Sequence, residues 1–362
     1  MAEVSQLQVE TALKAVIDPY LEKDLVSAKA VKNIAVSGGK VTVDIVLGYP
    51  AKGSRAALAA KLKEKVVAAG AKDVTINISS NIVSHGVQKG VKPLTSVKNI
   101  IAIASGKGGV GKSTVAVNLA LALSAEGATV GILDADIYGP SQPTMLGVKM
   151  KPESKDGKTL EPIMSYHLQS MSIGYLIDEE TPMIWRGPMV TQALEQLLRD
   201  TNWHDIDYLI IDLPPGTGDV QLTLAQKVPV TGAIIVTTPQ DIALLDARKG
   251  LKMFEKVEIP VLGVIENMST HICSKCSHEE HIFGAGGGAK MAEQYDVDFL
   301  GALPLDMRIR EETDAGKPTV VADPECRISH IYRDIARRVT AKLSLQKKDF
   351  SAKFPNIVIQ NT

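Results

Sequence analysis

Short apolar runs alternate with stretches of helical periodicity from residue 99 to residue 345. The runs are NIIAIAS, TVGILDAD, YLIIDLP, GAIIVTTP, VLGVIEN and DFLGALP. Continuous rather than alternating hydrophobicity is typical of strands buried on both faces, which predicts a mainly parallel sheet covered by helices on both faces. The carboxyl ends of the strands in such a sheet are where ligands bind. We therefore expect an α/β domain over 99–345, with its site among the polar residues that follow the runs.

Residues 1–83 have a different pattern, which predicts a small α+β domain. SQLQVETALKAVI has helical periodicity and is stopped by Asp18-Pro19, and GSRAALAAKLKEKVVAAG predicts a second helix. NIAVSGGKVTVDIVL alternates on either side of Ser37-Gly38-Gly39, which predicts a hairpin, and DVTINIS predicts a third strand. Residues 84–98 contain glycines, a proline and lysines without periodicity, so we expect a linker there, and residues 346–362 a C-terminal tail.

A glycine-rich segment joins the first expected strand of the α/β domain to the helical stretch VAVNLALALSAEG. It comprises Gly106, Lys107, Gly108, Gly109, Val110, Gly111, Lys112, Ser113 and Thr114. Strand, glycine-rich turn, Gly-Lys-Ser and helix are the context of a phosphate-binding P-loop, in which backbone N–H groups and the helix dipole hold phosphate oxygens. Lys112 would contact the β- and γ-phosphates of a nucleotide, and the Ser113 hydroxyl would ligate Mg²⁺.

Acidic residues end two other expected strands. Asp134 and Asp136 follow TVGIL, and Asp212 ends YLII before LPPGTGD. A carboxylate at the end of a buried strand is costly unless it is paired or faces a cation. The ends of these strands should lie at the same edge of the sheet as the glycine-rich segment. Asp212 therefore fits the Walker B role, in which it holds Mg²⁺ directly or through water.

Cys273 and Cys276 form a C-x-x-C pair after VLGVIEN, with His271 ahead of them and His278 and His281 behind. This spacing points two thiolates in the same direction, so the pair can hold one metal ion or one edge of a cluster. The residues alone leave three interpretations open. The pair is half of a zinc site completed by histidines, half of a cluster site completed by another chain, or a redox dithiol.

The amino-acid composition narrows the cellular compartment and the classes of partner that we expect. The 362 residues carry a formal net charge of -1, which argues against coating nucleic acid or anionic lipid through bulk electrostatics. The first residues lack the features of a secretory signal, and the apolar runs are shorter than the ~20 residues of a membrane-spanning helix. Three cysteines cannot form a fully paired disulfide framework, and we interpret Cys326 as a small apolar filler. We expect a cytoplasmic protein that binds neither nucleic acid nor membrane.

The segment ISHIYRDIARRVTAKL predicts a last amphipathic helix. Its apolar face would carry Ile328, Ile331, Ile335, Val339 and Leu343, with arginine and lysine opposite. Such a helix either docks on the sheet with a solvated basic face or binds a membrane surface. We expect the docked arrangement.

The motifs together resemble a known family. Lys107 in GKGGVGKST is the signature lysine of the deviant Walker A class, which contains the MinD/ParA partition ATPases, the nitrogenase iron protein and the Mrp/ApbC iron–sulfur carrier proteins. Within that class, DADIYGPS, WRGPM, DLPPGTGD, TTPQDIALLDARKG and ENMS…CSKC are similar to Mrp/ApbC, from Val97 to Arg338. The resemblance implies a P-loop NTPase fold. The N-terminal domain resembles a metal–sulfur cluster assembly domain, although Asp18-Pro19-Tyr20 matches its acidic signature only in part.

The resemblance implies roles for individual residues around ATP. Lys107 would cross a homodimer interface to the phosphates of the ATP bound to the partner, which would link dimer closure to hydrolysis. Asp136 would lie in switch I and position the attacking water, and the segment that begins at Asp212 would form switch II. Asn267 would face the adenine, beside the loop 303–306.

The resemblance also implies a cargo. An iron–sulfur cluster usually takes four thiolates, and a symmetric dimer would supply two from each chain. Cys273 and Cys276 of both chains would then hold a [4Fe-4S] cluster, with slow ATP hydrolysis coupled to cluster binding or transfer. Cluster scaffold proteins and iron–sulfur apoproteins would be the partners. Two other functions stay open, a MinD/ParA-like positioning ATPase and a nitrogenase-iron-protein-like reductase.

Overall fold

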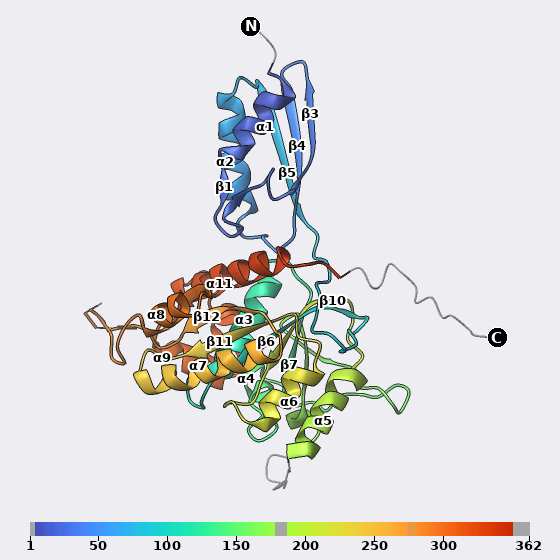
Figure 1. Cartoon of the computed structure of the whole chain (residues 1–362), viewed down its shortest axis with the longest axis vertical. Coiled ribbons are helices and arrows are strands. Elements are labelled where there is room, and N and C mark those ends of the chain that lie inside the picture. Colours follow the sequence, from blue (N-terminus) through green and yellow to red (C-terminus); the bar gives the residue numbers. More distant parts are fainter. Residues whose placement is uncertain (1–3, 178–186, 274, 277, 350–362) are drawn as a thin grey trace, which may run out of the picture.

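The structure is a computed structural model that describes residues 4–177, 187–273, 275–276 and 278–349. The chain folds into a small N-terminal unit and a larger unit, and the small unit stands on one end of the large one (Figure 1). The last helix of the chain, α11 (Arg327–Ser344), lies between the two units.

The N-terminal unit is a three-stranded sheet with helices on one face (Figure 1). The strand order is β3-β4-β5, in which β3 and β4 form an antiparallel hairpin and β4 and β5 run parallel. The predicted hairpin, third strand and helices are present, but the first helix ends at Lys14 because Ile17–Asp18 pairs with Lys23–Asp24. The elements are α1 (Gln6–Lys14), β1 (Ile17–Asp18), β2 (Lys23–Asp24), β3 (Val31–Ser37), β4 (Lys40–Leu47), α2 (Arg55–Ala68) and β5 (Asp73–Ser80).

The large unit is built on an eight-stranded sheet in the order β15-β12-β11-β6-β10-β7-β9-β8. Every neighbouring pair is parallel except β8 with β9, which is antiparallel. The six apolar runs are all strands, as predicted, whereas β8 and β9 have no such signal in the sequence. The strands are β6 (Val97–Ala104), β7 (Val130–Asp134), β8 (Ile163–Ser165), β9 (Leu168–Ser172), β10 (Ile206–Asp212), β11 (Gly232–Thr237), β12 (Val261–Glu266) and β15 (Phe299–Ala302).

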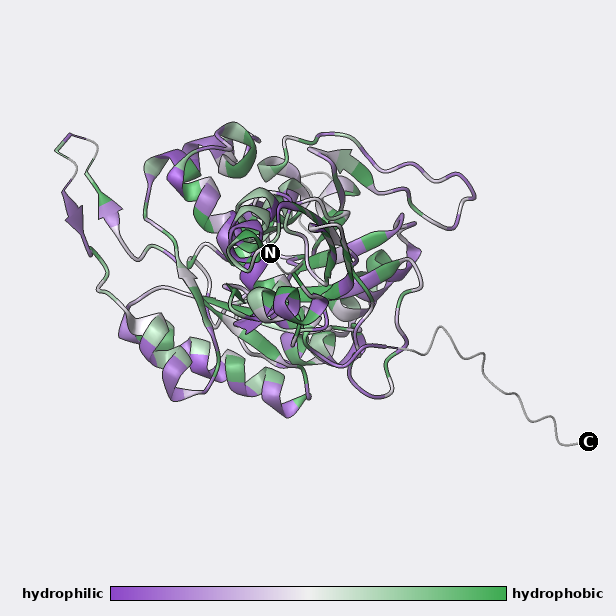
Figure 2. Ribbon diagram, turned by 90° about the horizontal axis from the view of Figure 1, so that it is seen from above, coloured by the Kyte–Doolittle hydropathy of each residue, from purple (hydrophilic) through white to green (hydrophobic). Residues whose placement is uncertain are grey.

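Helices cover both faces of this sheet, as the continuous apolar runs predict. One core cluster joins the sheet to α5 (Gly187–Asp200), α6 (Asp219–Lys227), α7 (Asp241–Lys256) and α8 (Gly287–Gln294). The other joins it to α3 (Lys112–Ala125), α10 (Thr319–Ala322) and α11. The helices alternate hydrophilic and hydrophobic residues, while the strands between them are largely hydrophobic (Figure 2). The prediction of an α/β sheet with helices on both faces is confirmed.

The last helix docks on the large unit, as expected. Ile328, Ile335, Val339 and Leu343 are buried and belong to the core cluster that contains α3, and Ile331 packs against that cluster. Within the described residues, no helix has the length and apolar character needed to cross a membrane.

The segment between β5 and β6 contains neither a helix nor a longer strand. His85 forms an isolated bridge with Lys348, and the buried His85 ring also hydrogen-bonds Asn99 through Nδ1 at 2.9 Å. This segment, which contains residues 84–96 of the expected linker, is therefore held against the start of β6 and the chain after α11. The last two residues of the expected linker, 97 and 98, belong to β6 instead.

Candidate functional site

The glycine-rich segment forms the turn between β6 and α3, as its pattern predicts. Gly109 and Gly111 have φ angles of 81° and 79°, which favour glycine. At Gly111 a Cβ atom would also lie 2.3 Å from Nδ2 of Asn267, so a side chain there would displace this amide. A Cβ at Gly106 would lie 2.1 Å from the carbonyl carbon of Asp246 in α7. The loop is thus a tight backbone turn that opens onto the N-terminus of α3, which is the arrangement that binds phosphate.

Lys112 and Asp212 form a buried ion pair at the centre of the site. The side chain of Lys112 is 5% exposed and that of Asp212 is 0% exposed. Lys112 Nζ donates to Asp212 Oδ1 and also to Ser113 Oγ at 3.3 Å. The predicted Lys112, Ser113 and Asp212 are therefore brought together, and each buried charge has its opposite as a partner.

Gln142 completes this cluster, although the sequence analysis did not single it out. It begins the short helix α4 (Gln142–Met145), and its Nε2 donates to Asp212 Oδ2 at 2.9 Å and to the Ser113 carbonyl at 3.2 Å. A glutamine in DIYGPSQPTM carries no local signal of this role, because its partners are distant in the sequence.

Asp134 shapes the loop that carries Asp136. Its fully buried carboxylate accepts hydrogen bonds from the backbone N–H groups of Asp136, Ser141 and Gln142, at 3.2, 3.0 and 3.1 Å. Burial, and then the neighbouring Asp212, raise the pKa of Asp134 above its ordinary value. Asp136 is half-buried, and burial together with Asp212 raises its pKa against the opposing effect of Lys112. The site therefore places two further carboxylates, those of Asp134 and Asp136, beside the Lys112–Asp212 pair.

The remaining predicted nucleotide residues lie around the same loop. Lys107 is half-buried, and its carbonyl accepts a hydrogen bond from Ser105 Oγ at 2.9 Å. The segment after Asp212 contacts the loop, because Gly216 N–H donates to the Ser105 carbonyl at 2.9 Å. Asn267 is buried, and its Nδ2 donates to the Val110 carbonyl at 2.8 Å. The site thus joins the ends of β6, β7, β10 and β12, as their common sheet edge predicts.

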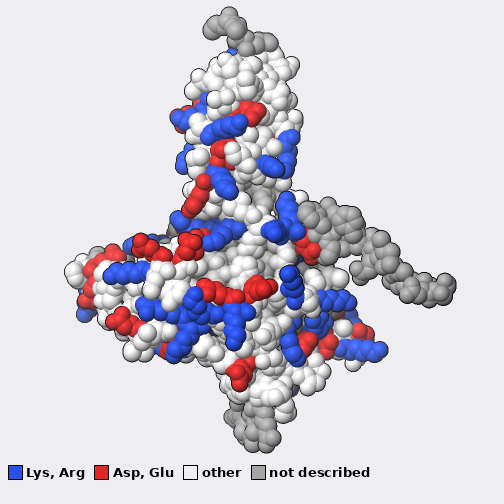
Figure 3. Space-filling view, in the orientation of Figure 1, with Lys and Arg blue, Asp and Glu red and all other residues white. Residues whose placement is uncertain are grey.

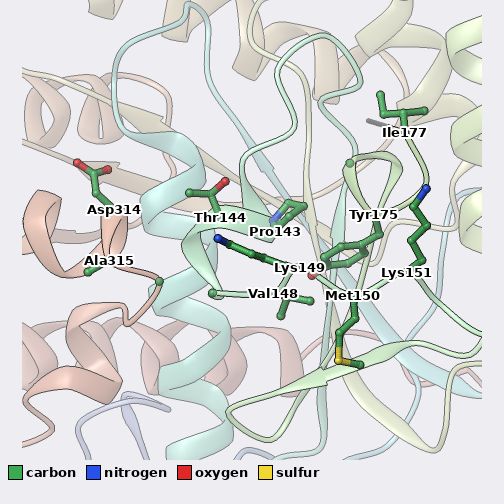
Figure 4. Close-up of a pocket in the computed structure, with 13 residues that line it drawn as sticks. Pro143, Thr144, Val148, Lys149, Met150, Lys151, Tyr175, Ile177, Asp314 and Ala315 are labelled. Carbon is green, nitrogen blue, oxygen red and sulfur yellow. The ribbon is translucent and has the colours of Figure 1, made fainter. Parts of the chain in front are cut away.

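A cavity of about 760 Å³ lies on another side of α4 (Figure 4). Pro143 and Thr144 of α4 line it together with Tyr175, and Lys149 extends across it toward Asp314, the last residue of α9 (Met307–Asp314). Helix α4 therefore contributes Gln142 to the carboxylate cluster and its next residues to this cavity.

Cys273 and Cys276 lie in the tip of a small hairpin of β13 (His271–Ile272) and β14 (Glu279–Glu280). Cys273 is half-buried and Cys276 is exposed, and Cys273 N–H donates to the His278 carbonyl at 2.9 Å. Hydrogen bonds from the backbone N–H groups of Lys275 and Cys276, and then from the Cys276 thiol, lower the pKa of Cys273. This environment favours the thiolate, which is the form that binds metal.

The histidines around the cysteine pair are bonded to the backbone. His271 Nδ1 lies 3.0 Å from the Leu305 carbonyl oxygen, and His281 Nδ1 lies 2.9 Å from that of Ser269. Within the described residues, no three His, Cys, Asp or Glu side chains come together as a metal site. The structure therefore does not assemble the zinc site completed by histidines. Cys326 lies apart from the pair, at the N-cap of α11, where its sulfur accepts from Ser329 N–H at 3.4 Å.

Glu266 holds the base of the cysteine hairpin in place. It is not among the residues that the sequence pattern predicts for the site. This buried side chain accepts from Ser269 Oγ at 2.6 Å and from the N–H groups of Gly288 and Gly286 at 2.6 and 3.3 Å. It thereby joins the end of β12 to the N-terminus of α8, on the two sides of the hairpin. Its one signal in the sequence is a charged residue at the end of an apolar run.

Comparison with known families agrees with this geometry. Residues 96–340 match the model of the NUBPL iron-transfer P-loop NTPases, and residues 6–78 match that of an iron–sulfur cluster assembly protein. The chain belongs to the NUBPL iron-transfer P-loop NTPase family. The predicted resemblance and the predicted P-loop NTPase fold are confirmed, and the chain is an NTPase by class.

Relatives of this NTPase include bacterial and animal proteins. It is 51% identical over 356 residues to an iron-sulfur cluster carrier protein of Escherichia coli K12, covering 96% of each chain. It is 50% identical to the iron-sulfur cluster transfer protein NUBPL of Mus musculus, covering 73% of this chain and 83% of the mouse protein.

Solved structures show the same fold. A nucleotide-binding protein from Archaeoglobus fulgidus in complex with ADP is 36% identical, with a TM-score of 0.56 over 64% of this chain and 90% of that one. The cell division ATPase MinD of Pyrococcus furiosus is 22% identical, with a TM-score of 0.51 over 67% of this chain and 98% of that one. The likeness to MinD concerns the fold alone. Trp185 and Arg186 of the WRGPM motif lie outside the described residues.

Proposed function

We propose that this NTPase is an ATP-dependent carrier that holds an iron–sulfur cluster between two copies of the chain and passes it to apoproteins in the cytoplasm. The observation that carries the proposal is the projecting hairpin of Cys273 and Cys276, whose chain begins beside Asn267 at the phosphate loop. The bacterial relative at 51% identity and the mouse relative at 50% are named for cluster carriage and transfer. The positioning ATPase is not favoured, because only the fold is shared with MinD.

The chain's own residues can bind and orient ATP. Lys112 and the loop N–H groups would hold the phosphates, and Asp136 would position the attacking water. Ser113 and Asp212 supply the oxygen ligands that Mg²⁺ prefers, and bound Mg²⁺ would neutralise charge on the phosphates. Asn267 lies against Gly111 and would face the adenine. Lys107 would reach the nucleotide of the partner copy, so hydrolysis would be slow until the dimer closes.

The cysteine pair needs a second source of thiolates to hold a [4Fe-4S] cluster. The chain has three cysteines, and Cys326 lies apart at the start of α11, so each copy offers two thiolates. Two copies related by a twofold axis would provide four. Ile272 and Ile282, on either side of the pair, are 36% and 53% exposed, and such exposed apolar side chains suit contact with a partner.

Nucleotide binding and cluster binding would be coupled through the residues that join the two sites. Asn267 bonds the phosphate loop, and Glu266 fixes the base of the hairpin from the adjacent position of β12. A change at the loop would therefore reach Cys273 through the chain that follows Asn267. Delivery of the cluster from scaffold proteins and its release to apoproteins would use the exposed face of the hairpin.

Anaerobic reconstitution with iron and sulfide tests the cluster assignment. The wild type should gain the broad visible absorption of an iron–sulfur cluster, Cys273→Ala should not, and Cys326→Ser should behave as the wild type. If Cys273→Ala takes up as much cluster as the wild type, the proposal fails. Transfer of the cluster to an apo-acceptor then separates a carrier from a reductase, which would keep its cluster through turnover.

A further inference from the structure

The segment Asp18-Pro19-Tyr20 of the N-terminal unit makes its hydrogen bonds within the protein. The carboxylate of Asp18 is fully buried and accepts hydrogen bonds from Tyr20 N–H and Leu21 N–H, both at 2.9 Å, and from the Tyr49 hydroxyl at 2.7 Å. These three donors occupy the carboxylate and fix the turn that follows it. The effect is to hold Tyr20 in one position on the surface of the unit.

Tyr20 contacts the large unit. Its hydroxyl accepts a hydrogen bond from Nη1 of Arg337 in α11, and the Arg337 guanidinium carbon lies 5.3 Å from the centre of its ring. The ring also packs edge-on against Tyr49, with 6.0 Å between the centroids. Asp18 thus fixes the position of the Tyr20 ring, which contacts the Arg337 guanidinium of the large unit.

The same arginine contacts Glu126, the C-cap residue of α3. Its fully buried carboxylate lies 3.4 Å from Arg337 Nη2 and 3.0 Å from Arg333 Nε. A carboxylate at a helix C-terminus opposes the helix dipole, and burial adds a desolvation cost. Glu126 is therefore tolerable only with cations and further donors around it.

The N-terminal unit supplies those further donors. Gly53 N–H donates to Glu126 Oε2 at 2.8 Å, and Lys52 N–H donates to the Glu126 carbonyl at 3.1 Å. A Cβ atom at Gly53 would lie 2.7 Å from Glu126 Oε1 and 3.0 Å from Arg333 Nη2, so a side chain there would displace this ion pair. The loop after β4 therefore caps the C-terminal end of the helix that begins at the phosphate loop.

Helix α3 connects this contact to the nucleotide site. It has 14 residues, which at about 1.5 Å per residue make a rod of about 21 Å with Lys112 at one end and Glu126 at the other. We propose that Tyr20 and Gly53 dock the N-terminal unit on Glu126, and that this docking and nucleotide binding at Lys112 strengthen each other through α3. The two contacts hold opposite ends of one helix, so a displacement of α3 at one end also displaces the other, and the coupling must be reciprocal.

The proposal rests on nucleotide binding by the proposed function, but not on the cluster. The test uses the full-length chain and Gly53→Ala, which disturbs the contact from the side of the N-terminal unit. Gly86→Ala is the matched control, because a Cβ there would meet only the Lys347 carbonyl oxygen at 3.7 Å. Tyr20→Phe is a second, milder variant that removes one hydroxyl and leaves the ring in place.

Two measurements follow for each protein, the Kd for Mg-ADP and the hydrogen exchange of the amides at positions 52 and 53. In Gly53→Ala the amides at positions 52 and 53 should exchange faster. The Kd for Mg-ADP should be about threefold to tenfold higher, which is within the usual range of coupling between two sites. Mg-ADP should slow this exchange in the wild type and in Gly86→Ala. Tyr20→Phe should change both quantities in the same direction as Gly53→Ala, by less.

The outcomes separate the parts of the proposal. Unchanged exchange in Gly53→Ala and Tyr20→Phe overturns the docking contact. Faster exchange with a wild-type Kd overturns the coupling alone. A wild-type chain that does not bind Mg-ADP overturns both the coupling and the nucleotide site of the proposed function.

Discussion

The phosphate-loop site and the cysteine hairpin differ in how much of each is built within one chain. Lys112, Asp212 and Gln142 are buried and partnered by one another. Cys276 is exposed, and its hairpin is joined to the core mainly at its base. Phosphate chemistry depends on prearranged charges, whereas a cargo that is handed on must be accessible. The nucleotide site is thus built within one chain, whereas the proposed cluster site lies on a projecting hairpin.

The largest expected effect is at the buried ion pair. Lys112→Ala leaves the Asp212 carboxylate buried without its cation, so we expect a loss of about 3–5 kcal/mol in the free energy of unfolding. ATP hydrolysis should also be lost. Denaturant unfolding and turnover measure both quantities. Lys107→Ala is the control for stability, because that side chain is half-buried and should cost less than about 1 kcal/mol. Equal stability of the two variants would contradict the buried-pair account.

Glu266 lies between the two regions and tests whether they are separable. Glu266→Gln weakens the charge-assisted bond to Gly288 N–H, so we expect a loss of about 1–2 kcal/mol in stability and faster hydrogen exchange in the hairpin. In the chain without a cluster, affinity for Mg-ADP should change less than about twofold, since the phosphate loop keeps its own contacts and no bound cluster is coupled to it. Glu279→Gln, on the exposed strand β14, is the control and should change neither quantity. A large loss of nucleotide affinity in Glu266→Gln without a cluster would show that the phosphate loop depends on the base of the hairpin even when no cluster is bound.

The smallest effect concerns the acidity of Cys273. Backbone N–H groups lower its pKa, so the thiolate should persist to lower pH than in an ordinary thiol. The rate of alkylation by iodoacetamide in the metal-free chain should rise with pH to a midpoint below the about 8.5 of a free cysteine. Lys275 lies between the two cysteines, so tryptic peptides report each one separately. A midpoint at or above about 8.5 for Cys273 would contradict the prediction that backbone N–H groups lower its pKa.

The buried strands and the phosphate loop could be predicted because each depends on residues that are close together along the chain. The buried strands β6, β7, β10, β11, β12 and β15 follow from continuous apolar runs, and the phosphate loop follows from glycines at fixed spacing. Strands β8 and β9 were not predicted, because IMS and LQSMS become strands through pairing with β7 and with each other.

Contacts between distant segments could not be predicted in the same way. Gln142 meets Asp212, and Gly53 meets Glu126, across long stretches of chain. The first helix ended earlier than predicted because Ile17–Asp18 pairs with Lys23–Asp24. In each case the residue type allows the contact, but only the folded chain determines its partner.

Charge on the surface bears on the choice of partner. Positive and negative side chains are interspersed over the face in Figure 3. On this face, the mixed charges leave no wide area of a single sign.

The most direct measurement is the ratio of iron to protein in the reconstituted chain, combined with its mass under native conditions. The account predicts one [4Fe-4S] cluster, about four iron atoms, per two chains, with the dimer and the cluster lost together in Cys276→Ser. Cys326→Ser should keep both. A single chain that carries a full cluster, or a dimer that carries one cluster per chain, would contradict the account.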